Sequence, residues 1–127
     1  MNEPAPSEPW RGEALTRLEP GEALEAGLVL DLDSRLHYTD GLLLVTDRRL
    51  VARRAGGEWQ AWPYRTGLRL THFDHAGVGC LELFDEAARL ATWRFTLGQN
   101  PAALRLTEAF ERQLESHLSG GPVERDE

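Results

Sequence analysis

Apolar and polar residues alternate with a period of two along much of the middle of the chain. Leu28, Leu30 and Leu32 alternate with Val29 and Asp31, a pattern that is typical of a half-buried β-strand. Comparable stretches, bounded by turn residues, recur as far as residue 97. They predict about seven strands, which cover residues 28–32, 42–46, 49–54, 58–62, 68–73, 80–84 and 90–97.

The residues between these stretches indicate how neighbouring strands are joined. Asp47-Arg48 predicts a tight turn. Gly56-Gly57 predicts a two-residue hairpin loop, because glycine readily adopts the positive φ that such a loop requires. A glycine-containing turn is expected at residues 75–79. Short loops of this kind join antiparallel strands, so antiparallel sheets are expected.

Near the C-terminus the period changes to that of a helix. Asn100 is suited to the N-cap and Pro101 to the first helical position, while a pair of glycines ends the pattern. The residues at helical spacing between these signals are Ala103, Leu106, Phe110, Leu114 and either His117 or Leu118. We therefore expect a helix over residues 101–118, with Phe110 and Leu114 buried beneath it.

A shorter helix is predicted before the first strand. Ser7 can act as its N-cap, and the helix would run over residues 8–18. Trp10, Ala14 and Leu18 are four residues apart, which places them on one face. This helix is expected to pack through that face.

These elements predict a mainly β fold with a C-terminal helix. Two antiparallel sheets of about seven strands in total would form a barrel or sandwich. Such sheets have open ends and edges that need cover, and the amphipathic C-terminal helix would close one end. We expect one domain over residues 8–118, a disordered tail at residues 1–7 and a tail or linker at residues 119–127.

Composition narrows the class of protein. The longest apolar run, at residues 41–45, is the size of a strand, whereas a membrane-spanning helix needs about 20 apolar residues. The first nine residues contain two acids and no base, unlike a secretory signal. Cys80 is the only cysteine, so neither an internal disulfide nor a cysteine-rich metal site can form. A soluble protein of the reducing cytoplasm is expected.

The net charge of −7 is concentrated at the two ends of the chain. Residues 1–25 and residues 108–127 each carry six acids and two arginines, so each contributes −4. The central region is close to neutral, and all fourteen basic residues of the chain are arginine. A nucleic-acid surface would need a concentrated basic face, so nucleic acid is not expected as a partner.

The order of strands followed by one helix resembles that of pleckstrin-homology-like (PH-like) domains. Residues 42–51, with the sequence LLLVTDRRLV, resemble a hairpin common in bacterial PH-like and GRAM-like domains. In such a hairpin Thr46 and Asp47 would support the turn by hydrogen bonds from side chain to backbone. This motif is structural, so it supports a fold and not a function.

A second resemblance covers residues 10–118. The segments WQAWP at 59–63, HFDHAGVG at 72–79 and GQNPAAL at 98–104 resemble the N-terminal cytoplasmic region of bacterial ABC exporters associated with cyanophycin metabolism. In those exporters a membrane domain and an ATPase domain would follow. This chain contains neither spanning helices nor a G-x-x-x-x-G-K-[ST] phosphate loop. The resemblance implies a front domain that is either detached or excised from such an exporter, with the start of the linker at residues 119–127.

His72, Asp74 and His75 form the most metal-like cluster in the sequence. Two imidazoles and a carboxylate could bind zinc. A single strand end rarely supplies three converging ligands, however, and Asp74 could simply cap the turn that follows. We interpret this weak polar cluster as stabilising a turn, and we assign no metal and no cofactor to the chain.

Arg48, Arg49, Arg53 and Arg54 form the main basic cluster. Phosphate or anionic lipid could bind to such a group. PH domains that bind phosphoinositides place basic residues in the first loop between strands, but residues 31–40 here contain three acids and one arginine. Direct lipid binding is therefore not expected, and a solvated or ion-paired strand face is favoured.

The aromatic residues Trp59 and Trp62 lie on the predicted hairpin beside these arginines. Their opposite parity points them to opposite faces of a regular strand. Because tryptophan and arginine are enriched at interface hot spots, we predict an interaction surface there, made by Arg48, Arg53, Arg54, Trp59 and Trp62.

No motif of an enzyme occurs in the chain, and Cys80 lies in an apolar strand where a thiol is usually inert. We expect a non-catalytic interaction or regulatory module, the front domain or a partner of such an exporter, located at the inner face of the membrane. The alternative is a ligand-binding module for an anionic headgroup or an Arg/Asp-rich peptide. An exposed aromatic patch would favour the first and a deep charged pocket the second.

Overall fold

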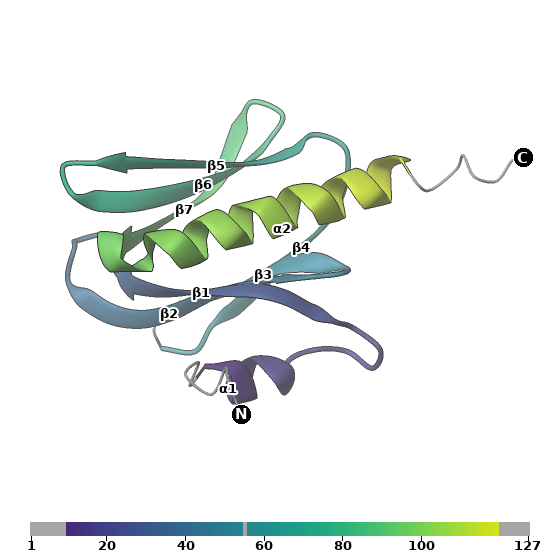
Figure 1. Ribbon diagram of the computed structural model, residues 1–127, viewed down its shortest axis with the longest axis horizontal. Coiled ribbons are helices and arrows are strands. Elements are labelled where there is room, and N and C mark those ends of the chain that lie inside the picture. The colour runs from purple at the N-terminus through teal and green to yellow at the C-terminus, as the bar shows by residue number, and fades with distance from the viewer. Residues whose placement is uncertain (1–9, 55, 120–127) are drawn as a thin grey trace, which may run out of the picture.

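The computed structural model describes residues 10–54 and 56–119 of the 127-residue chain. Seven strands and a long final helix confirm the predicted order of these elements (Figure 1). The strands are β1 (Leu24–Leu32), β2 (Tyr38–Thr46), β3 (Arg49–Arg53), β4 (Trp59–Pro63), β5 (Leu68–His75), β6 (Val78–Asp85) and β7 (Ala88–Thr96). A short helix α1 (Arg11–Leu15) precedes them, and a 3₁₀ turn η2 (Leu97–Gln99) leads into helix α2 (Asn100–Ser119).

The strands form one antiparallel sheet in the order β4-β3-β2-β1-β7-β6-β5. The expectation of two separate sheets is wrong, because β1 and β7 pair at one position, Leu32 opposite Arg94, and join all seven strands into one sheet. On either side of that point the strands form two hairpin-linked groups, which diverge in Figure 1 around α2. The sheet is therefore strongly curved about a single narrow junction.

Helix α2 covers the inner side of this curved sheet (Figure 1). Leu106 and Phe110 are fully buried among side chains of both strand groups, including Leu28 of β1 and Phe95 of β7. The predicted burial of Phe110 is confirmed, whereas Leu114 packs against the core and is only partly buried. Burying this apolar stripe stabilises both the helix and the curvature of the sheet.

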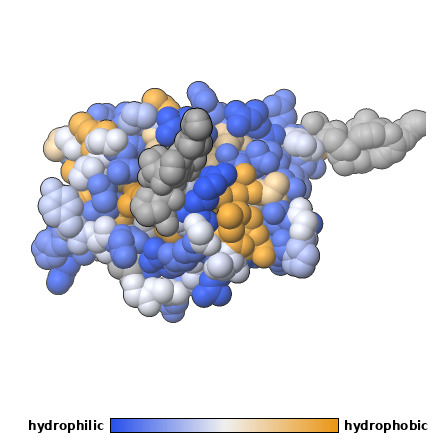
Figure 2. Space-filling view, turned by 60° about the horizontal axis from the view of Figure 1, so that its bottom comes forward, coloured by the Kyte–Doolittle hydropathy of each residue, from blue (hydrophilic) through white to orange (hydrophobic). Residues whose placement is uncertain are grey.

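Helix α1 covers the opposite, outer side of strands β2 and β3. Ala14 packs in a second buried cluster with Leu44 and Val51, and Trp10 and Trp59 flank it. The helix is shorter than the predicted range of 8–18, because turns replace helical structure after residue 15. Figure 2 shows this side of the molecule as largely hydrophilic, with a compact hydrophobic patch.

The predicted tails lie mostly outside the described residues, which exclude 1–9 and 120–127. The proposed N-cap Ser7 is among the residues excluded. Ser119, which we had assigned to the tail, is instead the last residue of α2. Within the two described ranges, no helix has both the length and the apolar character that crossing a membrane requires.

Candidate functional site

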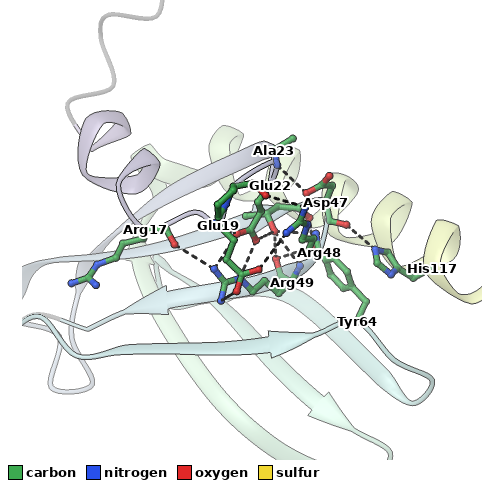
Figure 3. Close-up of polar contacts among 11 residues, drawn as sticks. Arg17, Glu19, Glu22, Ala23, Asp47, Arg48, Arg49, Tyr64 and His117 are labelled. Carbon is green, nitrogen blue, oxygen red and sulfur yellow. Dashed lines mark hydrogen bonds and ion pairs between the residues drawn. The ribbon is translucent and has the colours of Figure 1, made fainter.

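The turn between β2 and β3 is built by the side chain of Thr46. Its hydroxyl oxygen accepts hydrogen bonds from the backbone N–H groups of Arg48, at 3.0 Å, and Arg49, at 3.1 Å. The carboxylate of Asp47 instead accepts the backbone N–H of Ala23 at 2.9 Å (Figure 3). The TDRRL motif therefore fixes both its own turn and the segment that leads into β1.

Glu22 and Arg49 form a bidentate ion pair beside this turn (Figure 3). The side chain of Glu22 has no exposed surface and accepts from Nε and Nη2 of Arg49 at 2.9 and 3.0 Å. Burial by itself raises the pKa of Glu22, but hydrogen bonds from Arg49, Thr46 and the backbone N–H of Glu19 outweigh it and lower the pKa to about 2. The guanidinium of Arg49 is therefore paired within the protein and stabilises the fold.

Tyr64 and His117 attach two further segments to the same turn. The hydroxyl of Tyr64 donates to the carbonyl oxygen of Thr46 at 2.7 Å, and burial raises the pKa of this phenol. Nε2 of His117, near the end of α2, lies 2.7 Å from the carbonyl oxygen of Asp47 (Figure 3). Because a carbonyl oxygen only accepts, Nε2 is the protonated ring nitrogen. The whole network is structural.

A pocket of about 290 Å³ opens at the other end of β3. Its lining comes from four strands and the β1–β2 loop: Leu30, Leu32, Asp33, Ser34, Thr39, Gly41, Arg53, Arg54, Thr92, Trp93 and Arg94. Three arginines face one carboxylate in this lining, so the pocket is basic although the chain is acidic. This lining, which we call the arginine pocket, is the candidate functional site.

The three arginines of the pocket differ in how they are engaged. Nε of Arg53 lies 2.8 Å from a carboxylate oxygen of Glu13, and its Nη2 donates to the carbonyl oxygen of Asp40 at 2.9 Å. Arg54 and Arg94 have no ion pair with any residue in the described part of the chain. Arg54 and Arg94 are therefore the cations that an incoming anion could engage.

The carboxylate of Asp33 is used by its own loop. One of its oxygens accepts the backbone N–H groups of Arg35, at 2.8 Å, and His37, at 2.9 Å. The hydrogen bond from His37 is the main cause that lowers the pKa of Asp33, so this group stays ionised at neutral pH. Asp33 thus shapes the rim of the pocket and adds one negative charge to it.

Trp93, which also lines the pocket, has a buried indole N–H. The residue is 3% exposed, and its indole Nε1 has no hydrogen-bond partner among the described residues. Its ring packs edge to face against Trp62, with 5.7 Å between centroids. A buried N–H without an acceptor is unfavourable, so one residue of the lining holds an unsatisfied donor.

The structure divides the predicted interaction surface into separate parts. Arg48 lies at the opposite end of β3 and pairs with Glu19 at 3.3 Å, and Trp62 packs inward against the core. Trp59 lies on the outer side, where the guanidinium of Arg53 is 5.9 Å from its ring centroid. Arg53 and Arg54 therefore connect the outer side of the β3–β4 hairpin with the arginine pocket.

Sequence reasoning identified Arg53 and Arg54 but missed Arg94, Trp93 and Glu22. The pairing of Leu32 with Arg94 brings β7 to the pocket, and this pairing leaves no local signal in the sequence. Glu22 carried no local signal, since its partner Arg49 is 27 residues away.

The side chains of His72, Asp74 and His75, the weak polar cluster at the end of β5, do not form one site. Nε2 of His72 bonds Oδ1 of Asn100 at 2.9 Å and links β5 to the start of α2, whereas Asp74 and His75 are exposed. Asn100 is the first residue of the helix and not its N-cap. Among residues 10–54 and 56–119, no three His, Cys, Asp or Glu side chains are grouped so that they could bind a metal ion.

Cys80 is buried on β6, and burial raises the pKa of its thiol. A thiol of raised pKa is a poor nucleophile at neutral pH.

A second pocket, of about 320 Å³, is lined by three arginines and two glutamates, together with Trp10, Ala26 and Gly27. In comparisons of this chain with protein families, curated proteins and solved structures, no family model, protein or structure matches.

Proposed function

We propose that the chain is a non-catalytic PH-like interaction module that binds a protein partner through the arginine pocket and the adjoining β3–β4 hairpin. The observation that carries this proposal is the pair of unpaired cations, Arg54 and Arg94, in a concave site on an otherwise acidic molecule. Concave sites with a few converging polar groups are where proteins commonly bind ligands.

The PH-like assignment rests on the order and pairing of the elements. Two antiparallel meanders (β1–β4 and β5–β7), a narrow junction between β1 and β7, and a final helix over the inner side of the sheet all support it. The turn network around Thr46 gives the TDRRL resemblance a structural reason.

The cellular setting is proposed from sequence resemblance. The resemblance favours a chain that is the front domain, or a partner, of a bacterial ABC exporter linked to cyanophycin metabolism. The chain would then lie on the cytoplasmic side of the membrane. Direct attachment to lipid is disfavoured, because Arg48, Arg49 and Arg53 already have carboxylate partners. A protein partner is therefore preferred to a phosphoinositide surface.

Photo-crosslinking in cells that naturally produce the protein tests this function. A photo-reactive amino acid replaces Gln60, which is exposed on β4, and the matched control replaces Glu111, which is exposed on α2. The proposal expects a discrete protein adduct from position 60 and none of that mass from position 111. Adducts from position 111 alone would contradict it, as would a catalytic turnover that depends on the arginine pocket.

A further inference from the structure

We propose that the arginine pocket is a carboxylate site, in which Arg54 and Arg94 bind an Asp or Glu side chain from an acidic segment of the partner. This inference rests on the proposed function and specifies the chemistry of its ligand. Arg54 follows the end of β3 and Arg94 lies on β7, so two residues from separate parts of the sheet line one pocket.

The charge of the lining selects an anion. Arg53 is neutralised by Glu13 and braced by Asp40, so its charge is largely compensated. Arg54 and Arg94 have no carboxylate partner among residues 10–54 and 56–119, and guanidinium groups bind carboxylates with paired, charge-assisted hydrogen bonds. Ser34, Thr39 and Thr92 add hydroxyl groups to the lining, which can donate to the same anion.

The indole of Trp93 is an independent observation that points to an acceptor. Its buried Nε1 has no partner within residues 10–54 and 56–119, and the residue lines the pocket beside Arg94. An oxygen acceptor that reached Nε1 would satisfy this donor, whereas an apolar or cationic ligand would leave it unsatisfied. An anion is therefore the class of ligand that could both pair with Arg54 and Arg94 and accept a hydrogen bond from Trp93.

The size and rim of the pocket favour a monoanion. A volume of about 290 Å³ admits one side chain or a small molecule. The ionised Asp33 on the rim and Asp40 beside Arg53 would repel a phosphate dianion more strongly than a carboxylate. An anionic membrane would also repel the acidic ends of the chain, whereas a flexible acidic peptide can avoid them.

A titration with peptide followed by NMR tests this assignment on the full chain. The probe is a capped hexa-aspartate peptide, and capped hexa-asparagine is the neutral control of equal length. We expect hexa-aspartate to shift the indole N–H resonance of Trp93, and Arg54→Gln and Arg94→Gln each to weaken binding at least tenfold. The matched control is Arg69→Gln. Arg69 is exposed on β5 and does not line the arginine pocket, so this variant should leave the affinity for hexa-aspartate unchanged.

Four outcomes would overturn the carboxylate assignment. These are equal binding of hexa-asparagine, unchanged affinity in Arg54→Gln, tighter binding of inorganic phosphate, or tighter binding to vesicles of phosphatidylcholine and phosphatidylserine. If Arg94→Gln fails to fold, the affinity of Arg54→Gln for hexa-aspartate tests the assignment. Arg54 is exposed and follows the end of β3, so its replacement should not prevent folding. A crosslink from position 60 that persists while hexa-aspartate fails to bind would reject the carboxylate and retain the interaction module.

Discussion

The indole ring of Trp10 lies directly against the backbone of Gly27 in the middle of β1. A Cβ atom at position 27 would overlap three ring carbons of this tryptophan. Glycine normally weakens a strand, and its presence here is explained by the close approach of the ring. This contact attaches the segment before α1 to the outer side of the sheet.

Replacing Gly27 with Ala is therefore expected to destabilise the protein by about 1–3 kcal/mol, the usual cost of overpacking. Urea denaturation measures the change. Gly12→Ala is the matched control, because a Cβ there meets no atom within 4 Å. Adding Trp10→Ala should relieve the overlap, so the double variant should lose less stability than the two single variants combined. Strict additivity would show that the two residues do not share this contact.

The buried ion pair of Glu22 should make stability depend on acid pH. Folding lowers the pKa of Glu22 from its ordinary value of 4.5 to about 2. The stabilisation is thus fully present above about pH 4.5 and is lost as the pH falls toward 2, by about 3 kcal/mol in total. Denaturation at several pH values between 7 and 2 measures the loss.

Glu22→Gln provides the comparison for this measurement. At pH 7 it should cost about 3 kcal/mol, because it leaves Arg49 without its carboxylate. Its deficit relative to the unmodified protein should shrink as the pH falls through the same window. Glu111→Gln, on the exposed side of α2, should leave the pH profile unchanged. A constant deficit at all pH values would contradict the lowered pKa.

Much of the fold is readable from the sequence, because strands and helix α2 follow local periodicity. The strands begin and end within a few residues of their predicted limits. Gly56 and Gly57 have the expected positive φ, but the predicted two-residue loop is wrong, because β3 ends at Arg53 and β4 begins only at Trp59. The junction between β1 and β7 was not predictable, since it depends on two strands far apart in the chain. The arginine pocket was not predictable for the same reason, because Arg54 and Arg94 line one pocket only when β1 and β7 are joined.

Phe110 anchors α2 in the core, and its removal should be costly. Phe110→Ala should reduce the free energy of unfolding by about 3–5 kcal/mol, as is usual when a core phenylalanine is truncated. Leu104→Ala, at a position that is 49% exposed on the same helix, is the matched control and should cost far less. Equal losses from the two variants would show that α2 does not cover the core through Phe110.

Vesicles containing phosphoinositide should not bind the chain appreciably at physiological salt. The net charge is −7, and Arg48 and Arg53 already have carboxylate partners. Co-sedimentation with liposomes checks this expectation. Strong, salt-sensitive binding that disappears in Arg48→Glu and Arg53→Glu would contradict it.

The most direct test of the interaction module is the yield of the hairpin adduct when the two unpaired arginines are removed. With the photo-reactive residue at position 60, Arg54→Gln combined with Arg94→Gln should lower the yield at least tenfold, whereas Arg69→Gln should leave it unchanged. Circular dichroism and the thermal midpoint establish that each variant is folded. An undiminished adduct from the folded double variant would show that the arginine pocket does not bind the partner.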